Sequence, residues 1–200
     1  FEDAEGQRLA LVDDDGAGDP PAAWERSPVP AEHQIRGLGP IVISVPTLSP
    51  TDMLLTRVLN MRLVRDYAHP ENPSTPVHVF EMGDGGAPAE LHVAVQPDLS
   101  VAQQGAGGVH HVAFRTPDVD YERWAERLNE LHVPNSGPVD RFWFRSLYLR
   151  EPNGVLFEIA TDGPGFGVDE DAATLGEKVV LPPFLESHRD QIVANLKPID

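Results

Sequence analysis

Two short stretches, Gly108-Val-His-His-Val-Ala-Phe-Arg115 and Val155-Leu-Phe-Glu-Ile-Ala160, decide the fold of this chain. Both have the apolar character of buried strands, yet His110 and His111 interrupt the first and Glu158 interrupts the second. Burying an imidazole or a carboxylate costs several kcal/mol unless another group pairs with it. Both groups are ligands for divalent metals, so a bound ion would offset that cost. The pattern therefore predicts two strands that carry a metal site.

The residues around these stretches follow a β-α-β-β-β order. After the strand at 108–115, a helix is predicted over 118–131, because its apolar residues recur at helical spacing. These residues are Tyr121, Trp124, Leu128 and Leu131. Three strands are predicted to follow, at 139–142, 145–149 and 155–161, with Pro152-Asn153-Gly154 as the turn between the last two.

The preceding part of the chain repeats this order, which indicates a duplicated module. A strand is predicted at 38–45, a helix at about 49–60, and strands at 61–66, 77–82 and 91–95. The opening stretch Glu5-Gly-Gln-Arg-Leu-Ala-Leu-Val12 matches Asn153-Gly-Val-Leu-Phe-Glu-Ile-Ala160, so we expect it to be the last strand of an amino-terminally truncated module. The predicted organisation is 1–13 for that strand, 14–34 for a linker, 35–97 for a module without metal ligands, 98–166 for a module with metal ligands, and 167–200 for a loop and a terminal helix.

Comparing the copies provides an internal control for the metal hypothesis. Gly39 and Pro40 fall opposite His110 and His111, and Ala10 falls opposite Glu158, so the strands can be built without ligand chemistry. Adjacent strand residues point to opposite faces, so one histidine of the pair can be a surface or core residue. We interpret His111 and Glu158 as the metal pair.

The other histidines receive ordinary structural interpretations. His33 and His69 are expected in loops, His132 at a helix end and His188 on the terminal helix. Two more, His78 and His92, fall on predicted strands of the other module, where we expect cross-strand or surface roles.

The composition excludes several classes of function. The 200 residues contain 15 Lys plus Arg against 32 Asp plus Glu, a formal charge of −17, which disfavours nucleic acids and anionic membranes. Cysteine is absent, which rules out disulfides and thiolate metal sites. No apolar run approaches the roughly 20 residues that span a bilayer, and we expect a cytoplasmic protein.

Four motifs carry a family resemblance. They are Gly107 to Arg115, Asp140 to Pro152, Gly154 to Phe166, and Leu181-Pro-Pro-Phe-Leu-Glu186 with Arg189. The chain resembles the vicinal oxygen chelate superfamily, also called the glyoxalase, bleomycin-resistance and extradiol-dioxygenase fold, and within it the ring-cleaving dioxygenases that act on hydroquinone-type phenols. The resemblance implies an α+β fold in which βαβββ modules form open, cup-shaped mixed sheets, followed here by the terminal helix.

The same resemblance implies the cofactor, the substrates and the site. It implies a non-haem Fe(II), or Mn(II), held by two histidines and one glutamate, with substrate and dioxygen bound side by side. By the motif match, His111 and Glu158 are metal ligands, and His110, Arg141 and Tyr148 are neighbours with catalytic roles. The remaining ligand would come from a first module that we expect to be missing here. The expected partners are a small aromatic substrate and dioxygen, with a homo-oligomer for the full-length protein.

Alternatives remain open for residues and for function. Arg141 can form a surface ion pair with Asp140, Tyr148 can be a half-buried strand aromatic, and Trp143 and Phe144 fit a core or pocket wall. A glyoxalase-like metal-dependent isomerase or lyase would use the same scaffold. A non-enzymatic protein that binds small aromatic compounds, such as a resistance protein, is the other alternative.

Overall fold

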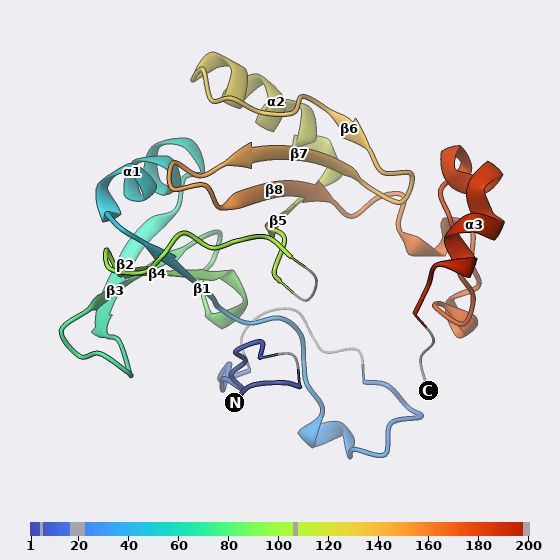
Figure 1. Ribbon diagram of the computed structural model, residues 1–200, viewed down its shortest axis with the longest axis horizontal. Coiled ribbons are helices and arrows are strands. Elements are labelled where there is room, and N and C mark those ends of the chain that lie inside the picture. Colours follow the sequence, from blue (N-terminus) through green and yellow to red (C-terminus); the bar gives the residue numbers. More distant parts are fainter. Residues whose placement is uncertain (5, 17–22, 106–107, 198–200) are drawn as a thin grey trace. The chain divides into compact units, whose positions relative to one another are not determined.

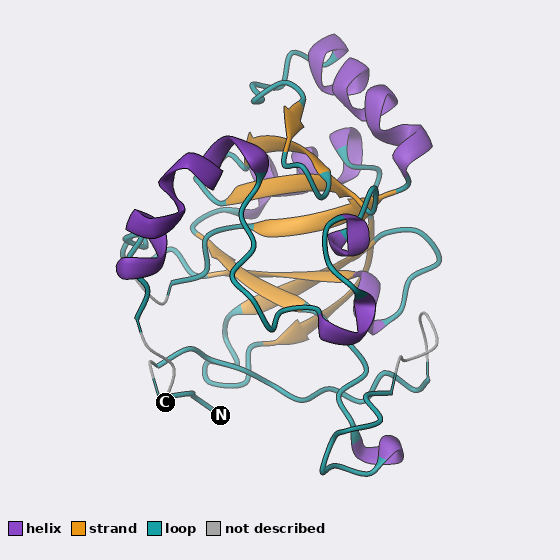
Figure 2. Ribbon diagram, turned by 90° about the vertical axis from the view of Figure 1, so that its right-hand side faces the viewer, coloured by secondary structure: helices purple, strands orange, loops and turns teal. Residues whose placement is uncertain are grey.

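The computed structural model describes residues 1–4, 6–16, 23–105 and 108–197. The chain divides into two units, here called unit 1 (Phe1–His110 with Glu151–Gly154) and unit 2 (His111–Arg150 with Val155–Asp200). Each unit contains one four-stranded mixed sheet, and the chain is therefore of the α+β class (Figures 1 and 2).

Unit 1 contains the first β-α-β-β-β module. Its elements are β1 Ile41–Val45, α1 Leu48–Met53 continued by a π-helical turn Leu54–Val58, β2 Arg62–Ala68, β3 Pro76–Glu81 and β4 Glu90–Val95, with short 3-10 helices at Ala31–His33 and Ala87–Ala89. The Thr56 hydroxyl donates to the Asp52 carbonyl at 2.7 Å, and the Leu59 amide donates to Leu54, five residues back. The helical hydrogen bonds therefore change over this turn from the i to i−4 pattern of an α-helix to the i to i−5 pattern of a π-helix. The predicted helix is present, but its second half is not α-helical.

Unit 2 contains the second module and the carboxy-terminal segment. Its elements are β5 Val112–Thr116, a 3-10 turn Asp118–Asp120 leading into α2 Tyr121–Glu130, β6 Val139–Asp140, β7 Arg145–Arg150, β8 Leu156–Thr161, 3-10 helices at Phe166–Val168, Ala172–Thr174 and Pro183–His188, and α3 Arg189–Ala194. Helix α2 lies against the sheet of this unit (Figure 1). None of the helices in the described part of the chain is long and apolar enough to cross a membrane.

The cores of the two modules follow from their apolar spacing. On α2 the buried residues Tyr121, Ala125 and Leu128 recur every three or four positions, which places them on the sheet side of the helix. On the sheet below, Phe114 and Phe157 meet edge to face with ring centroids 5.1 Å apart. The opposite face of this sheet is therefore left for polar side chains.

The strand pairing gives a residue-by-residue equivalence between the modules. The sheet orders are β1-β4-β3-β2 and β5-β8-β7-β6, and the parallel ladders begin at Ile41 with Leu91 and at Val112 with Phe157. One residue further along, His92 therefore occupies in unit 1 the position that Glu158 occupies in unit 2.

The same pairing aligns the residues next to these two positions. Val79 pairs with His92 as Tyr148 pairs with Glu158, and Val77 pairs with Ala94 as Ser146 pairs with Ala160. Pro40 precedes β1 as His111 precedes β5. The two modules thus offer matched positions with different chemistry.

Several boundaries differ from the sequence prediction. The strand predicted at the amino terminus is not formed in the described residues 6–13, where an isolated bridge between Glu2 and Arg8 is the pairing present. An extended segment forms a strand only when a neighbour supplies a ladder. Strand β5 begins at Val112, so His110 and His111 precede it, although we predicted them within the strand.

The last two differences concern β6 and the terminal helix. Strand β6 ends at Asp140 instead of continuing to 142, because the chain turns there and Phe142 has a left-handed φ of 74°. The predicted terminal helix is a 3-10 segment followed by the six-residue α3, and Phe184 on it is 63% exposed. Phe184 is therefore largely exposed and lies outside the core.

Candidate metal centre

His111 and Glu158 approach each other within unit 2. The His111 Nε2 atom lies 2.7 Å from Glu158 Oε2. Glu158 comes from the middle of β8 and pairs with Ala113 of β5, and His111 lies two residues before Ala113. Extended residues two apart share a face. The two side chains therefore meet on the sheet face opposite α2, although sequence alone left their relative orientation open.

Burial makes this pair chemically significant. The Glu158 side chain is 4% exposed and the His111 side chain 33% exposed. A carboxylate this buried requires a positive or hydrogen-bonding partner. His111 is one such partner, and the Ser146 hydroxyl, which bonds to Glu158 Oε1, is another.

The separation is also close to what a shared ion requires. Two ligand atoms at about 2.1 Å from one metal and at right angles lie roughly 3 Å apart. If the distance between His111 Nε2 and Glu158 Oε2 increased from 2.7 Å by a few tenths of an ångström, both atoms could therefore bind one metal ion. Among the residues that the structure describes, no third His, Cys, Asp or Glu joins the pair.

Tyr148 and Arg141 form a second polar group beside this pair. The Tyr148 ring stands edge-on to the His111 imidazole, with centroids 6.1 Å apart. Arg141 Nε and Nη2 donate to the Tyr148 hydroxyl oxygen at 3.1 and 3.0 Å, and the guanidinium carbon lies 5.0 Å from the ring centroid. Arg141 thus turns to Tyr148 and not to Asp140, whose carboxylate accepts from the Phe142 amide.

The turn after β6 positions Arg141. Phe142 has the left-handed backbone given above, and the Arg141 amide donates to the Phe144 carbonyl at 2.8 Å. A hollow of about 260 Å³ lies beside this turn, lined by Asp140, Phe142, Pro183 and Phe184. Trp143 donates from Nε1 to Asp169, and both Trp143 and Phe144 contact the Phe166 ring. These two aromatics therefore form a partly exposed wall at the turn and are not in the core.

The other histidines described next have surroundings that differ from those of His111. His110 is exposed, belongs to unit 1, and keeps its catalytic role as a prediction only. His78 forms a cross-strand contact with Asp66, 2.7 Å from Nδ1 to Oδ1, as predicted. His132 Nδ1 donates to the Asn129 and Glu130 backbone carbonyls at the end of α2, at 3.1 and 3.0 Å.

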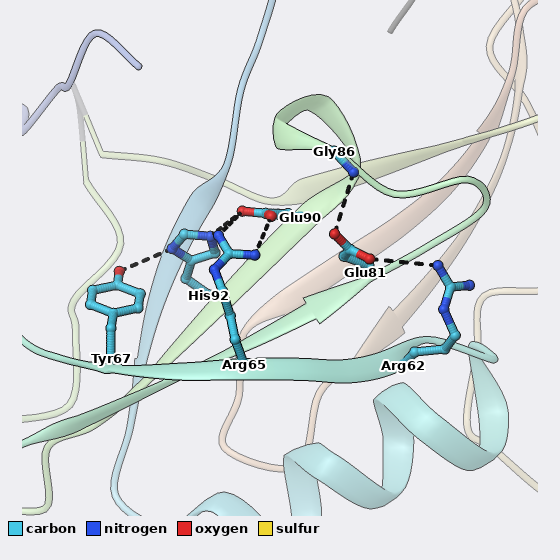
Figure 3. A network of polar contacts seen from close by, with 7 residues as sticks. All are labelled: Arg62, Arg65, Tyr67, Glu81, Gly86, Glu90 and His92. Atoms are coloured by element: carbon cyan, nitrogen blue, oxygen red, sulfur yellow. Dashed lines mark hydrogen bonds and ion pairs between the residues drawn. The ribbon is translucent and has the colours of Figure 1, made fainter. Parts of the chain in front are cut away.

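Unit 1 carries a polar network on the matched face of its own sheet, and we did not predict it as a unit (Figure 3). Arg65 makes two bonds to Glu90, at 2.6 and 2.8 Å, and Glu90 Oε2 lies 2.7 Å from His92 Nε2. The Tyr67 hydroxyl lies 3.0 Å from His92 Nδ1. Both imidazole nitrogens and both carboxylate oxygens are thus engaged. The sequence signal was available: Glu90 and His92 are two apart on one strand and so share a face.

The charges in this network stabilise one another. The hydrogen bonds from Arg65, with a further contribution from His92, lower the pKa of Glu90 against the opposing effect of burial, and the Glu90 bond raises the pKa of Arg65. Burial raises the pKa of Tyr67, which keeps the phenol protonated. Both oxygens of Glu90 accept hydrogen bonds from the Arg65 guanidinium, so this cluster is less suited to bind a metal than His111 and Glu158.

Known proteins identify the family. The model of the glyoxalase/bleomycin resistance protein/dioxygenase superfamily matches residues 37–159. The chain belongs to this superfamily. The matched range begins before β1 and ends within β8, and the family assignment agrees with the resemblance found from the motifs.

Three relatives of this superfamily member are informative. The provisionally named ring-cleaving dioxygenase MhqA of Bacillus subtilis (strain 168) is 42% identical over 200 residues, which cover 100% of this chain and 63% of that protein. The chlorohydroquinone/hydroquinone 1,2-dioxygenase of Sphingobium indicum is 29% identical over 199 residues, covering 96% and 57%. A crystal structure of a provisionally assigned dioxygenase from Bacillus subtilis aligns with a TM-score of 0.75 and 30% identity, covering 89% and 55%. The chain thus spans about 60% of the length of the curated relatives.

Proposed function

We propose that this chain contributes His111 and Glu158 to the metal centre of a ring-cleaving dioxygenase that acts on hydroquinone-type aromatics. The observation that carries the proposal is the 2.7 Å approach of His111 Nε2 to the buried Glu158 Oε2. The names of the relatives support the reaction class, since they include ring-cleaving and hydroquinone dioxygenases.

The donor set suits Fe(II), with Mn(II) as the other candidate. One imidazole and one carboxylate are two members of the two-histidine, one-carboxylate set that leaves coordination positions open. When bound, such an ion brings a phenol and dioxygen together and passes electrons between them. We propose that the third protein ligand lies outside the described residues, among which no third His, Cys, Asp or Glu joins the pair.

The neighbouring side chains can bind and orient a phenolic substrate. Arg141 donates two N–H groups to the Tyr148 oxygen, so the Tyr148 hydroxyl proton remains available to donate to a bound oxygen atom. The nearby guanidinium charge would offset negative charge that develops on a bound phenolic substrate. His110, next to the ligand in sequence, is proposed to hold or transfer a proton to substrate. We further propose that the protein is cytoplasmic and forms a homo-oligomer.

Metal binding tests the site directly. In the protein that carries this sequence, Fe(II) bound under anaerobic conditions should be lost in Glu158→Gln and His111→Ala, with affinity reduced at least about 100-fold. The matched control is His92→Gln, because His92 occupies the Glu158 position in unit 1. Its metal content should equal that of the wild type, once circular dichroism has shown that each variant is folded.

Dioxygen uptake with hydroquinones tests the reaction. We expect uptake that requires the metal and disappears in both ligand variants. Retention of metal by Glu158→Gln would contradict the site. Metal binding without dioxygen uptake, but with turnover in the presence of Ni(II) or Zn(II), would instead favour an isomerase or lyase. Aromatic binding that persists unchanged after chelation would favour a non-enzymatic binding protein.

A further inference from the structure

Ser146 is a buried hydroxyl that contacts the Glu158 carboxylate. It lies on β7, is 0% exposed, and pairs with Ala160, two residues along β8 from Glu158. Ser146 and Glu158 therefore share a sheet face. The Ser146 hydroxyl bonds to Glu158 Oε1.

The two oxygens of Glu158 consequently have different partners. Oε1 is bonded to Ser146, whereas Oε2 faces His111 Nε2 at 2.7 Å. An ionised carboxylate can only accept hydrogen bonds, so the serine hydroxyl must be the donor. Hydrogen bonds to ionised groups are stronger than those between neutral groups, which makes this an effective restraint on the carboxylate rotation.

The backbone of Ser146 is itself fixed from the other face of the sheet. The Tyr121 hydroxyl of α2 donates to the Ser146 carbonyl at 2.8 Å and accepts from the Val139 amide at 3.3 Å. Tyr121 is 1% exposed, and burial raises its pKa, so its hydroxyl stays protonated as a donor. Ser146 is thus held at both its carbonyl and its hydroxyl.

The other module shows that the fold does not need this hydroxyl. Val77 occupies the matched position on β3, where it is 0% exposed, and His92 stands at the matched position for Glu158. A β-branched apolar residue therefore fits at this place on the sheet. The hydroxyl occurs in the module that carries the carboxylate.

We propose that Ser146 is a positioning residue that holds Oε1 of Glu158, so that Oε2 alone is presented to the ion beside His111. This inference rests on the proposed function. A carboxylate that binds through one oxygen occupies one coordination position, whereas binding through both would occupy two and remove a position needed by substrate or dioxygen. Ser146 thereby keeps the open geometry that ring cleavage requires.

Co(II) provides a probe that does not depend on turnover. Titrating the protein with Co(II) should show about 10-fold to 100-fold weaker binding for Ser146→Ala than for the wild type, as expected when a partner of a metal ligand is removed. The visible absorption bands of bound Co(II) should also shift, because they report the number and arrangement of ligand atoms. Ser146→Thr keeps the hydroxyl and should restore both affinity and spectrum.

Two controls separate positioning from packing. Val77→Ala removes buried volume at the matched place in unit 1 and should leave Co(II) affinity and spectrum unchanged. Glu158→Gln should abolish binding, which reports on the site itself.

The outcomes distinguish the two proposals. Wild-type affinity and spectrum in Ser146→Ala would overturn the positioning role while leaving the metal site intact. A loss that Val77→Ala reproduces, or that a folded Ser146→Thr fails to reverse, would also overturn it, since packing would then be the cause. Undiminished binding in Glu158→Gln would instead overturn the proposed function.

Discussion

Unit 1 and unit 2 place an ionisable residue at the same point of the same kind of sheet, with different results. In unit 1 that residue is His92, whose two ring nitrogens contact Tyr67 and Glu90, and both oxygens of Glu90 accept from Arg65. In unit 2 it is Glu158, whose Oε2 faces the partly exposed His111. A buried ionisable residue can therefore be paired within its own sheet, as His92 is, and burial alone does not indicate a ligand site.

The largest expected effect on stability tests whether the cores of the two modules are equivalent. Phe157 and Leu91 begin the matched parallel ladders, and each is 0% exposed. We expect Phe157→Ala to reduce the free energy of unfolding by about 3–5 kcal/mol and Leu91→Ala by about 2–5 kcal/mol, because both leave cavities. Urea denaturation measures both. If either variant lost less than about 1 kcal/mol of unfolding free energy, the substituted side chain would not be part of the core of its module.

An intermediate effect is expected at Arg65. Arg65→Met leaves the buried Glu90 without its main partner, and since the Arg65 side chain is 50% exposed we expect a loss of only about 1–2 kcal/mol. Arg141→Met in unit 2 is the matched control, because Arg141 contacts a phenol and not a carboxylate. It should change unfolding free energy by less than about 0.5 kcal/mol.

The Arg65 effect should depend on pH with a defined sign. The folded pKa of Glu90 is below its ordinary value of 4.5, mainly because of the bonds from Arg65. Its stabilising contribution is therefore fully present above that value and is lost as pH falls through the lowered folded pKa. The stability difference between the wild type and Arg65→Met should shrink when urea denaturation is repeated in acid. A difference that grows on acidification would contradict the assigned ion pair.

The smallest effects distinguish the two tyrosines. Tyr67→Phe removes the bond to His92 and should cost about 1 kcal/mol of stability without changing metal binding. Tyr148→Phe should leave stability within about 0.5 kcal/mol, yet lower kcat about tenfold, because the phenol would no longer donate to bound oxygen. Calorimetry and dioxygen uptake measure the two effects. If Tyr67→Phe and Tyr148→Phe changed stability and kcat to the same extent, the proposed difference in role between the two tyrosines would be contradicted.

Local patterns predicted most of the fold. The apolar strand around 108–115 and the helical spacing of Tyr121, Trp124, Leu128 and Leu131 are read over a few residues, so both modules were predicted in the correct element order, although the buried set on α2 is Tyr121, Ala125 and Leu128. The strand predicted within residues 1–13 is not formed in the described part of that segment, because a strand also needs a partner that local sequence does not reveal. The shortened β6 depends on a turn conformation at Phe142 that few non-glycine residues adopt.

The candidate site was only partly predictable. His111 and Glu158 were chosen because their residue types are unusual in apolar strands, but their 2.7 Å approach depends on strand register. Ser146 was missed, although aligning the modules places this hydroxyl opposite Val77, a signal of the same kind as Pro40 opposite His111. The Arg65 and Tyr67 network joins β2 to β4 across β3, and such non-local contacts leave no periodic trace in sequence.

The left-handed Phe142 has a consequence for engineering. A non-glycine residue in this region is strained by about 1 kcal/mol or more, and glycine would relieve that cost. Phe142→Gly would also free the loop that orients Arg141, so a gain in thermal tolerance would be accompanied by a less ordered guanidinium. Screening variants of this chain by melting temperature alone would therefore select against an ordered Arg141 side chain.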